Sequence, residues 1–269
     1  YALKLTVGSG EDNKFGVATF LEYIDCGDLR GKTISLQAKL KATAAITDVR
    51  MAVLEWTGTG DTVTSDVVSS WGSAGTVPTL VGSWAYLKIA SADPANLGVT
   101  TSWATYRVEG LTVGASANNL AAFIWCEDES TTVTTDILRI TDVQLEEGPT
   151  CSGYDRRPFD LEWLLCRRYY RTYGIHVVGV FPGATHWAHT VPFADVPMRT
   201  SPTGALLATT ISVTEPTVAV RTGTSCTLVP FLASNYGYSA RITAADFAGT
   251  PVAFAFGTTQ DMVELSSEM

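Results

Sequence analysis

The stretch Thr33-Ile-Ser-Leu-Gln-Ala-Lys-Leu-Lys41 alternates polar and apolar side chains at every second position. Successive side chains of a β-strand point to opposite faces, so this period is typical of a strand with one buried face. Similar short runs, rich in Val, Ile, Leu, Thr and aromatic residues, lie on both sides of it and are separated by Gly, Asp and Asn. The pattern therefore predicts that the chain from Tyr1 to about Gly148 is built from β-strands.

Eight strands are expected in this part of the chain. They are Ala2–Val7, Val17–Tyr23, Thr33–Lys41, Asp48–Trp56, Ala85–Ile89, Ala104–Glu109, Leu120–Cys126 and Ile137–Leu145. Between Trp56 and Trp84 the sequence is rich in Thr, Ser, Gly and Val without a clear period, which indicates long loops with room for one short strand. Eight strands within residues 1–150 predict a mainly β fold, a jelly-roll β-sandwich.

The segment from Asp155 to Gly174 carries the one strong helix pattern. Asp160 can cap the N-terminus and Gly174 can end the helix, so we expect a helix from about Leu161 to Tyr173. One face of it is apolar, with Leu161, Leu164, Leu165 and Tyr169. Its C-terminal half is basic, with Arg167, Arg168 and Arg171. These arginines suit either polar contacts in a protein interface or a solvated helix face.

Short strand patterns separated by prolines return from Ile175 onward. They predict a small C-terminal β domain. The expected organisation is therefore a jelly roll at residues 1–150, a linker and connecting α-helix at 151–174, and a C-terminal β domain at 175–269.

Composition excludes several classes of protein. Of the 269 residues, 46% are hydrophobic and 17% are charged, which excludes a disordered tail, a coiled coil and a collagen-like fibre. No apolar run approaches the ~20 residues that span a bilayer, so no membrane insertion is expected. The net charge of −9 has the wrong sign for a phosphate-binding surface, so no nucleic-acid partner is expected. The five cysteines are widely spaced and odd in number, which indicates mostly buried thiols from a reducing compartment.

The junction between the two β regions contains three recognisable runs. They are Ile140-Thr-Asp-Val-Gln-Leu-Glu-Glu-Gly148, Arg156-Arg-Pro-Phe159 and Leu161-Glu-Trp-Leu-Leu-Cys-Arg-Arg-Tyr-Tyr170. This junction resembles one found in bacteriophage tail-fibre and receptor-binding proteins, which typically reads DVQLEEG, (F)ERP and ELALCQRYY. Tyr154-Asp155 stands where that family usually has Phe-Glu, and Trp163 and Arg167 replace its common Ala and Gln.

The resemblance covers most of the chain. Residues 54–71, 102–107 and 119–125 resemble the carbohydrate-binding-module-like jelly roll that precedes the junction in this family, and residues 196–202 and 263–265 resemble its small C-terminal β domain. In the family, earlier sequence usually supplies the first strand of the sandwich. The resemblance therefore implies that this chain is a processed or partial piece, or that another element provides that strand.

The resemblance implies a virion protein of a phage tail, a fibre, spike or baseplate component assembled in the bacterial cytoplasm. Its expected partners are other tail proteins, two further copies in a homotrimer, and a polysaccharide of the host surface. A short helix must pack against something to be stable, and the resembling proteins place this element at the trimer interface. The interface candidates are therefore Leu161, Leu164, Leu165, Tyr169 and Tyr170. The alternatives are a purely architectural component without a ligand and, less favoured, a polysaccharide-degrading enzyme.

Tryptophans supply the candidates for glycan binding, because flat aromatic faces beside polar loops stack on pyranose rings. Trp103 and Trp125 lie in or beside strong strand patterns and are expected to be structural. Trp56, Trp71 and Trp84 flank the long loop region and are the glycan-binding candidates, with core packing as the alternative for each.

Neither a metal site nor catalysis is expected. Glu127-Asp-Glu129 and Glu146-Glu147 offer oxygen ligands for calcium but lack the spacing of a calcium loop, so solvated charge is the favoured interpretation. His186 and His189 lack further ligands at a suitable spacing, and nearby prolines disfavour a helix there. The sequence contains no nucleophile elbow, HExxH motif, P-loop or GxGxxG motif. We therefore expect a protein without cofactor or enzymatic activity.

Overall fold

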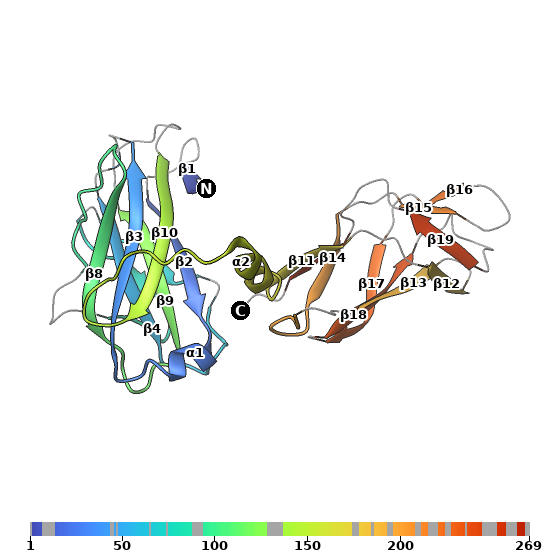
Figure 1. Ribbon diagram of the computed structural model, residues 1–269, viewed down its shortest axis with the longest axis horizontal. Coiled ribbons are helices and arrows are strands. Elements are labelled where there is room, and N and C mark those ends of the chain that lie inside the picture. The colour runs from blue at the N-terminus through green and yellow to red at the C-terminus, as the bar shows by residue number, and fades with distance from the viewer. Residues whose placement is uncertain are drawn as a thin grey trace. The chain divides into compact units, whose positions relative to one another are not determined.

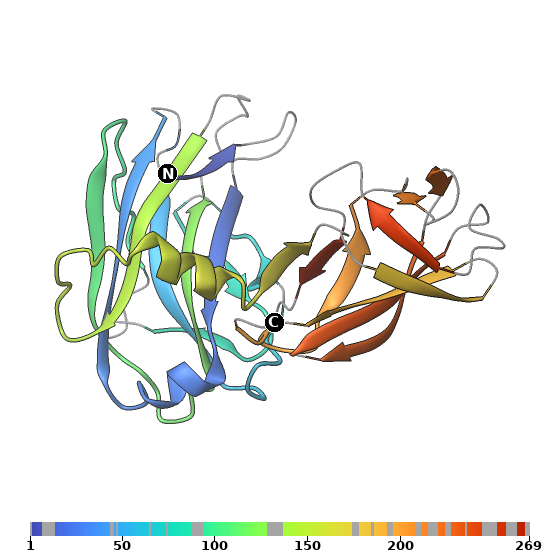
Figure 2. The ribbon, with the colours of Figure 1, turned by 45° about the vertical axis from the view of Figure 1, so that its right-hand side comes forward.

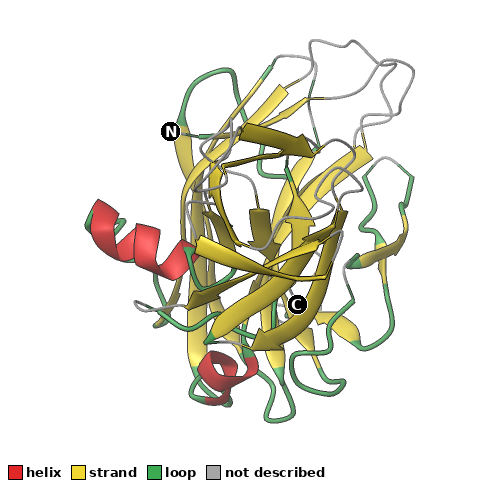
Figure 3. Cartoon of the chain, turned by 90° about the vertical axis from the view of Figure 1, so that its right-hand side faces the viewer, coloured by secondary structure: helices red, strands yellow, loops and turns green. Residues whose placement is uncertain are grey.

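The structure is a computed structural model in two compact units, Tyr1–Arg156 and Arg157–Glu268 (Figure 1). It describes residues 2–6, 14–43, 46, 48–64, 66–73, 75–87, 94–127, 137–173, 178–183, 186–192, 196–207, 211–214, 220–223, 227–234, 236–243, 252–256 and 263–266. Strands dominate both units and the helices are short (Figure 3), as a mainly β fold requires. Neither helix of the described residues has the length and apolar character needed to cross a membrane.

The first unit is a sandwich of two four-stranded antiparallel sheets (Figures 1 and 2). Its strands are β1 (Leu3–Thr6), β2 (Lys14–Leu21), β3 (Thr33–Ala42), β4 (Val49–Trp56), β7 (Trp84–Tyr86), β8 (Ala104–Thr112), β9 (Asn119–Glu127) and β10 (Ile137–Glu147). One sheet has the order β1-β10-β3-β8 and the other β2-β9-β4-β7. This strand order, with the chain passing repeatedly between the two sheets, is that of a jelly roll and confirms the predicted fold class.

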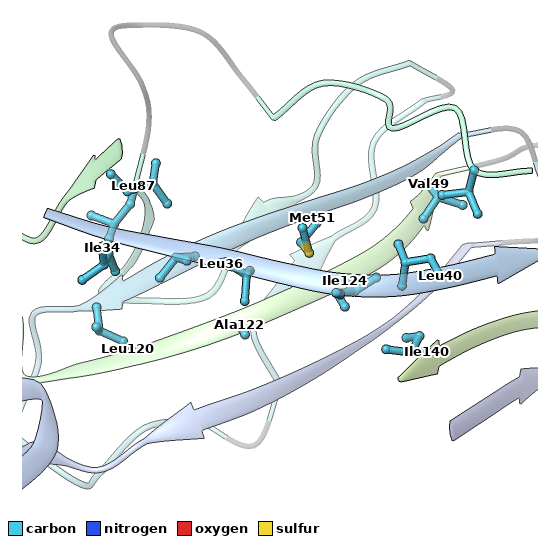
Figure 4. Close-up of a cluster of buried hydrophobic side chains, with 14 of the residues drawn as sticks. Ile34, Leu36, Leu40, Val49, Met51, Leu87, Leu120, Ala122, Ile124 and Ile140 are labelled. Atoms are coloured by element: carbon cyan, nitrogen blue, oxygen red, sulfur yellow. The ribbon is translucent and has the colours of Figure 1, made fainter. Parts of the chain in front are cut away.

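The main core lies between the two sheets and follows the period of the strands (Figure 4). Ile34, Leu36 and Leu40 of β3 are fully buried against the side chains of β4 and β9, which include Met51 and Ile124. The alternation that predicts the strand in the sequence thus places its apolar side chains on the inner face of the sandwich.

The predicted strand Ala2–Val7 is present in shortened form as β1. Leu3–Thr6 pairs antiparallel with β10 at the edge of its sheet. The prediction of a strand over Val17–Tyr23 is also shifted, because β2 ends at Leu21 and Tyr23 begins the short helix α1 (Tyr23–Gly27).

The segment between β4 and β7 forms a second apolar layer. It contains a hairpin of β5 (Val68–Ser70) and β6 (Thr79–Leu80), where the sequence indicates at most one strand. Together with the outer face of the β2-β9-β4-β7 sheet it buries Ala52, Leu54, Trp56, Val63, Val67, Val68, Trp84, Ala121, Phe123 and Trp125. Both faces of this sheet are therefore buried, whereas a simple sandwich buries one.

The second unit begins with the helix α2 (Phe159–Cys166) and continues in strands. These are β11 (Tyr170–Tyr173), β12 (Val178–Gly183), β13 (His186–Pro192), β14 (Thr203–Leu206), β15 (Ile211–Thr214), β16 (Val220–Gly223), β17 (Thr227–Ser234), β18 (Gly237–Thr243), β19 (Val252–Phe256) and β20 (Val263–Ser266). They form a three-stranded sheet, β11-β20-β14, and a seven-stranded sheet, β16-β15-β19-β12-β13-β18-β17.

The helix differs from its prediction at both ends. It begins after Pro158, which provides no side-chain cap, and Asp160 lies within the first turn, where a carboxylate is favourable near the helix N-terminus. It ends at Cys166, because Tyr170–Tyr173 pairs with β20 as a strand. Aromatic and β-branched residues favour strands, and a backbone partner from the end of the chain outweighs the local helical pattern.

Candidate functional site

A small open pocket of about 130 Å³ lies on the outer face of the β2-β9-β4-β7 sheet, at the edge of the second apolar layer. Its lining residues are Gly16, Ala18, Phe20, Asp66, Val67, Val68, Trp71 and Phe123. Gly16, Ala18 and Phe20 occupy every second position of β2 and therefore share one face of the sheet. This is the outer face, because Ala18 and Phe20 pack against the second apolar layer. The segment between β4 and β7 supplies the wall that contains Asp66 and Trp71. We call this hollow the aromatic pocket.

The floor of the aromatic pocket depends on a glycine. The rings of Phe123 and Trp125 stack with their centroids 4.6 Å apart and their planes at 11°. A Cβ added at Gly16 would lie 2.7 Å from Cε2 of Phe123, closer than van der Waals contact allows. Glycine at this position therefore lets the Phe123 ring lie over β2.

The pocket wall is anchored at one end by a buried ion pair. Arg50 donates to Asp48 at 3.1 Å and also to the carbonyl oxygens of Pro94 at 2.5 Å and Gly75 at 2.9 Å. The other Asp48 oxygen accepts the Gly75 N–H at 3.0 Å. One guanidinium and one carboxylate thus connect β4 to two separate loops.

A buried asparagine anchors the other end. The Asn119 side chain accepts the N–H of Asp61 at 2.9 Å and donates to the Asp61 carboxylate at 2.9 Å. Asp61 has a positive φ of 56°, so this pairing also holds a backbone conformation that a residue other than glycine rarely adopts. The wall is therefore attached to the sheet at two points, Asp61 and Gly75.

Two of the three tryptophan candidates are part of the second apolar layer. Trp56 is 8% exposed and Trp84 is 5% exposed, and their rings pack against each other with centroids 5.3 Å apart. Their indole N–H groups donate to the Thr59 carbonyl at 2.9 Å and the Thr64 hydroxyl at 3.2 Å. Their ring faces are covered by protein, which argues against a stacking role and favours the packing alternative.

Trp71 is the one candidate of the three that lines the aromatic pocket, where it is half-buried. Asp66 beside it is exposed, and one of its carboxylate oxygens accepts the Val68 N–H at 2.9 Å. An aromatic face and a carboxylate in one hollow can contact the apolar and the hydroxyl-bearing faces of a sugar. Sequence reasoning missed Phe20 and Phe123, because their meeting depends on the register of β2 and β9. It also missed Asp66, because this residue lies in the segment before β5, where the sequence has no clear period. The only signal for it is the apolar character of both faces of the strands.

The acidic pair Glu146-Glu147 has a structural role. The Glu146 carboxylate accepts the Ser152 N–H and O–H, both at 2.7 Å, and these hydrogen bonds hold the pKa of Glu146 below its usual value. Glu147 pairs with Lys32 at 2.8 Å. Among the described residues, no group of three or more His, Cys, Asp or Glu is placed to hold a metal ion. The side chains of Glu127-Asp-Glu129, His186 and His189 lie outside the described residues.

The junction segment after β10 is fixed to the first unit by side chains of the VQLEEG run. Besides the Glu146 bonds, Gln144 accepts the Asp155 N–H at 2.8 Å, and Glu109 of β8 accepts the Cys151 N–H at 2.8 Å. Burial and the charges of Glu109 and Glu146 raise the pKa of the Cys151 thiol to about 11. The VQLEEG run therefore has a structural role, because its side chains hold the segment that leads into the second unit.

The four described cysteines are free thiols. Cys26 and Cys126 are buried, Cys151 is half-buried and Cys166 is exposed. Burial raises the pKa of Cys26. The expectation of mostly buried thiols therefore fits two of these four, and Cys226 lies outside the described residues.

The expected interface residues lie in and after α2. Leu161, Leu165 and Tyr170 are exposed, while Leu164 and Tyr169 are half-buried. No residue of α2 is buried. The arginines of this region make contacts within the chain. Arg167 lies over the Trp163 ring at 4.4 Å, and Arg171, itself buried, donates to the carbonyls of Arg167 and Val196.

Comparison with known proteins gives no family assignment. No family model and no curated protein matches the chain. Among solved structures, the chain is weakly similar to the N-terminal CBM22-1–CBM22-2 tandem domain of Xyn10C from Paenibacillus barcinonensis. The two share 10% sequence identity with a TM-score of 0.29, and the match covers 100% of this chain and 91% of the other. A score this low carries no conclusion about the ligand.

Proposed function

We propose that this chain is a host-recognition subunit of a phage-type tail, whose jelly roll binds a glycan of the bacterial surface in the aromatic pocket. The observation that carries the binding part is the position of Trp71, the candidate that faces this pocket together with Asp66. The virion part rests on the likeness of residues 140–170 to the tail-fibre junction. The proposed activity is binding without catalysis.

The chemistry of the pocket suits a neutral sugar. Trp71 and Phe20 offer apolar surface to the C–H face of a pyranose, and the Asp66 carboxylate can accept hydrogen bonds from adjacent hydroxyls. Among the described residues that line the pocket, Asp66 is the only charged one, so it disfavours an anionic sugar at this place. One shallow contact of this kind binds weakly, and several copies on one particle would raise the overall affinity.

Replacing Trp71 with Ala tests the glycan proposal. We expect loss of binding by about tenfold or more on a bacterial glycan array and in calorimetry with the best hit, since a truncated aromatic anchor typically has this effect. The matched control is Trp103→Ala, which removes a 39% exposed tryptophan that does not line the pocket. Equal affinity of Trp71→Ala and the unchanged protein would contradict the proposal. An array with no binding by the intact assembly would favour the architectural alternative.

We further propose that the subunit is a homotrimer that buries the exposed apolar side chains of α2. An isolated eight-residue helix has little stability of its own, and Leu161 and Leu165 project into solvent in the single chain. Symmetric copies would cover these side chains with one another. The expected mass in light scattering is three times the 28.8 kDa of the chain.

The double variant Leu161→Glu/Leu165→Glu should shift this mass toward that of a single chain, because it places carboxylates in the proposed interface. Tyr236→Ser serves as the control, since Tyr236 is an exposed aromatic residue of the same unit outside α2. A monomeric unchanged protein, or a trimer that tolerates both glutamates, would refute this interface.

A further inference from the structure

Cations gather on the outer face of the other sheet of the jelly roll. In the strand register, Arg139 of β10 lies opposite Lys41 of β3 on one side and opposite Lys4 of β1 on the other. Directly opposite residues share a face of the sheet, so these three side chains form one row across three neighbouring strands. Lys39 lies two positions from Lys41 and faces the same way. We call Lys4, Arg139 and Lys41 the cationic row.

This arrangement is unfavourable for folding alone. Like charges directly opposite each other in a sheet repel. Residues 1–150 contain eighteen acidic and ten basic residues, so carboxylates are plentiful in this part of the sequence. Elsewhere in the unit cations have such partners: Lys32 pairs with Glu147 and Arg50 with Asp48. In the described part of the chain, the salt bridges include no member of the cationic row.

The row borders a second open pocket of about 190 Å³, where β3 ends and β10 begins. Lys41, Ala42, Thr43, Ile137 and Arg139 line it. Arg139 is exposed and Lys41 is half-buried, so both charged groups are accessible from solvent. The planar guanidinium of an arginine matches the two oxygens of a carboxylate or phosphate, and a lysine adds a compact positive charge.

We infer that this pocket binds an oxyanion carried by a polysaccharide, a uronate carboxylate or a phosphate substituent, between Arg139 and Lys41. The site lies on the β1-β10-β3-β8 sheet, whereas the aromatic pocket lies on the β2-β9-β4-β7 sheet. The anion site therefore does not depend on sugar binding at Trp71, whereas the polysaccharide as the carrier of the anion rests on the proposed function. The small pocket and the net charge of −9 favour a single anionic group over an extended phosphate backbone.

Backbone NMR of the full chain tests the site with three probes at low ionic strength: sodium glucuronate, inorganic phosphate and glucose. Glucuronate and phosphate should shift the amide signals of Lys41, Thr43 and Arg139 in a saturable way, and added salt should weaken both. Glucose should leave these signals in place. The tighter of the two anions identifies whether the natural group is a carboxylate or a phosphate.

The variant Lys41→Gln/Arg139→Gln should bind the preferred anion about tenfold more weakly or not at all. Lys32→Gln removes a cation outside the pocket and should bind normally, as should Trp71→Ala. If Trp71→Ala does not weaken glycan binding while the anion still binds at Arg139 and Lys41, only the proposed function is contradicted. The absence of saturable shifts, equal shifts with glucose, or unchanged binding by the double variant would overturn this inference.

A stability measurement gives an independent readout. Arg139→Glu would place a carboxylate between Lys4 and Lys41 in the same register. We expect a higher melting temperature, because repulsion becomes attraction, together with loss of anion binding. A melting temperature that does not rise, combined with intact anion binding, would contradict the assigned role of the row.

Discussion

Replacing Trp84 with Ala should lower the free energy of unfolding of the first unit by about 3–5 kcal/mol, as is usual for a buried tryptophan. Its ring packs against Trp56 and, with centroids 5.7 Å apart, against Phe20. Truncation would leave a cavity in the second apolar layer and would remove the donor to the Thr64 hydroxyl. Urea unfolding of the full chain, followed by tryptophan fluorescence, measures the effect on the transition of the first unit.

The same experiment on Trp71→Ala separates the two roles of tryptophan in this segment. Because Trp71 is half-buried, its loss should cost only about 1–2 kcal/mol. Trp84→Ala should therefore damage folding more, whereas Trp71→Ala should damage binding more. The reverse order in the unfolding experiment would mean that Trp84 is not a packing residue and would reopen its role as a ligand contact.

The jelly roll could be predicted from the sequence because its strands follow a period of two. Ile34, Leu36 and Leu40 alternate with polar residues, and this alternation specifies the strand and the face that packs in the core. It does not predict that Ser35 and Gln37 on the opposite face are buried as well. The second apolar layer could not be predicted in the same way. Trp56 and Trp84 stand at the ends of a segment without a period, and only the paired strands bring the two rings together.

The helix shows the opposite case, because the local sequence pattern predicts a helix that extends too far at its C-terminal end. Tyr169–Tyr173 continues a plausible helical face in the sequence, yet Tyr170–Tyr173 pairs with Val263–Ser266. Val263–Ser266 lies about ninety residues further along the chain, and its sequence does not identify Tyr170–Tyr173 as the strand with which it pairs. The aromatic pocket depends on similar long-range pairing, since Ala18 and Phe123 meet through the register of β2 and β9.

Replacing Arg50 with Met should also lower the free energy of unfolding of the first unit, by about 3–5 kcal/mol. The methionine keeps much of the buried volume but leaves the Asp48 carboxylate buried without its cation. It also removes the donors to the carbonyls of Pro94 and Gly75. Denaturant unfolding of the full chain again provides the measurement.

A second variant decides whether the unpaired charge is the cause. Asp48→Asn/Arg50→Met has no buried charge at this place, and the Asn oxygen can still accept the Gly75 N–H. It should therefore be more stable than Arg50→Met alone, since removing both members of a buried pair costs less than removing one. If the double variant is as unstable as Arg50→Met, the loss of stability comes from the missing hydrogen bonds to the carbonyls of Pro94 and Gly75. The wall of the aromatic pocket would then be held by the guanidinium hydrogen bonds, and glycan binding should fall in both variants because the segment that contains Trp71 is attached there through Gly75.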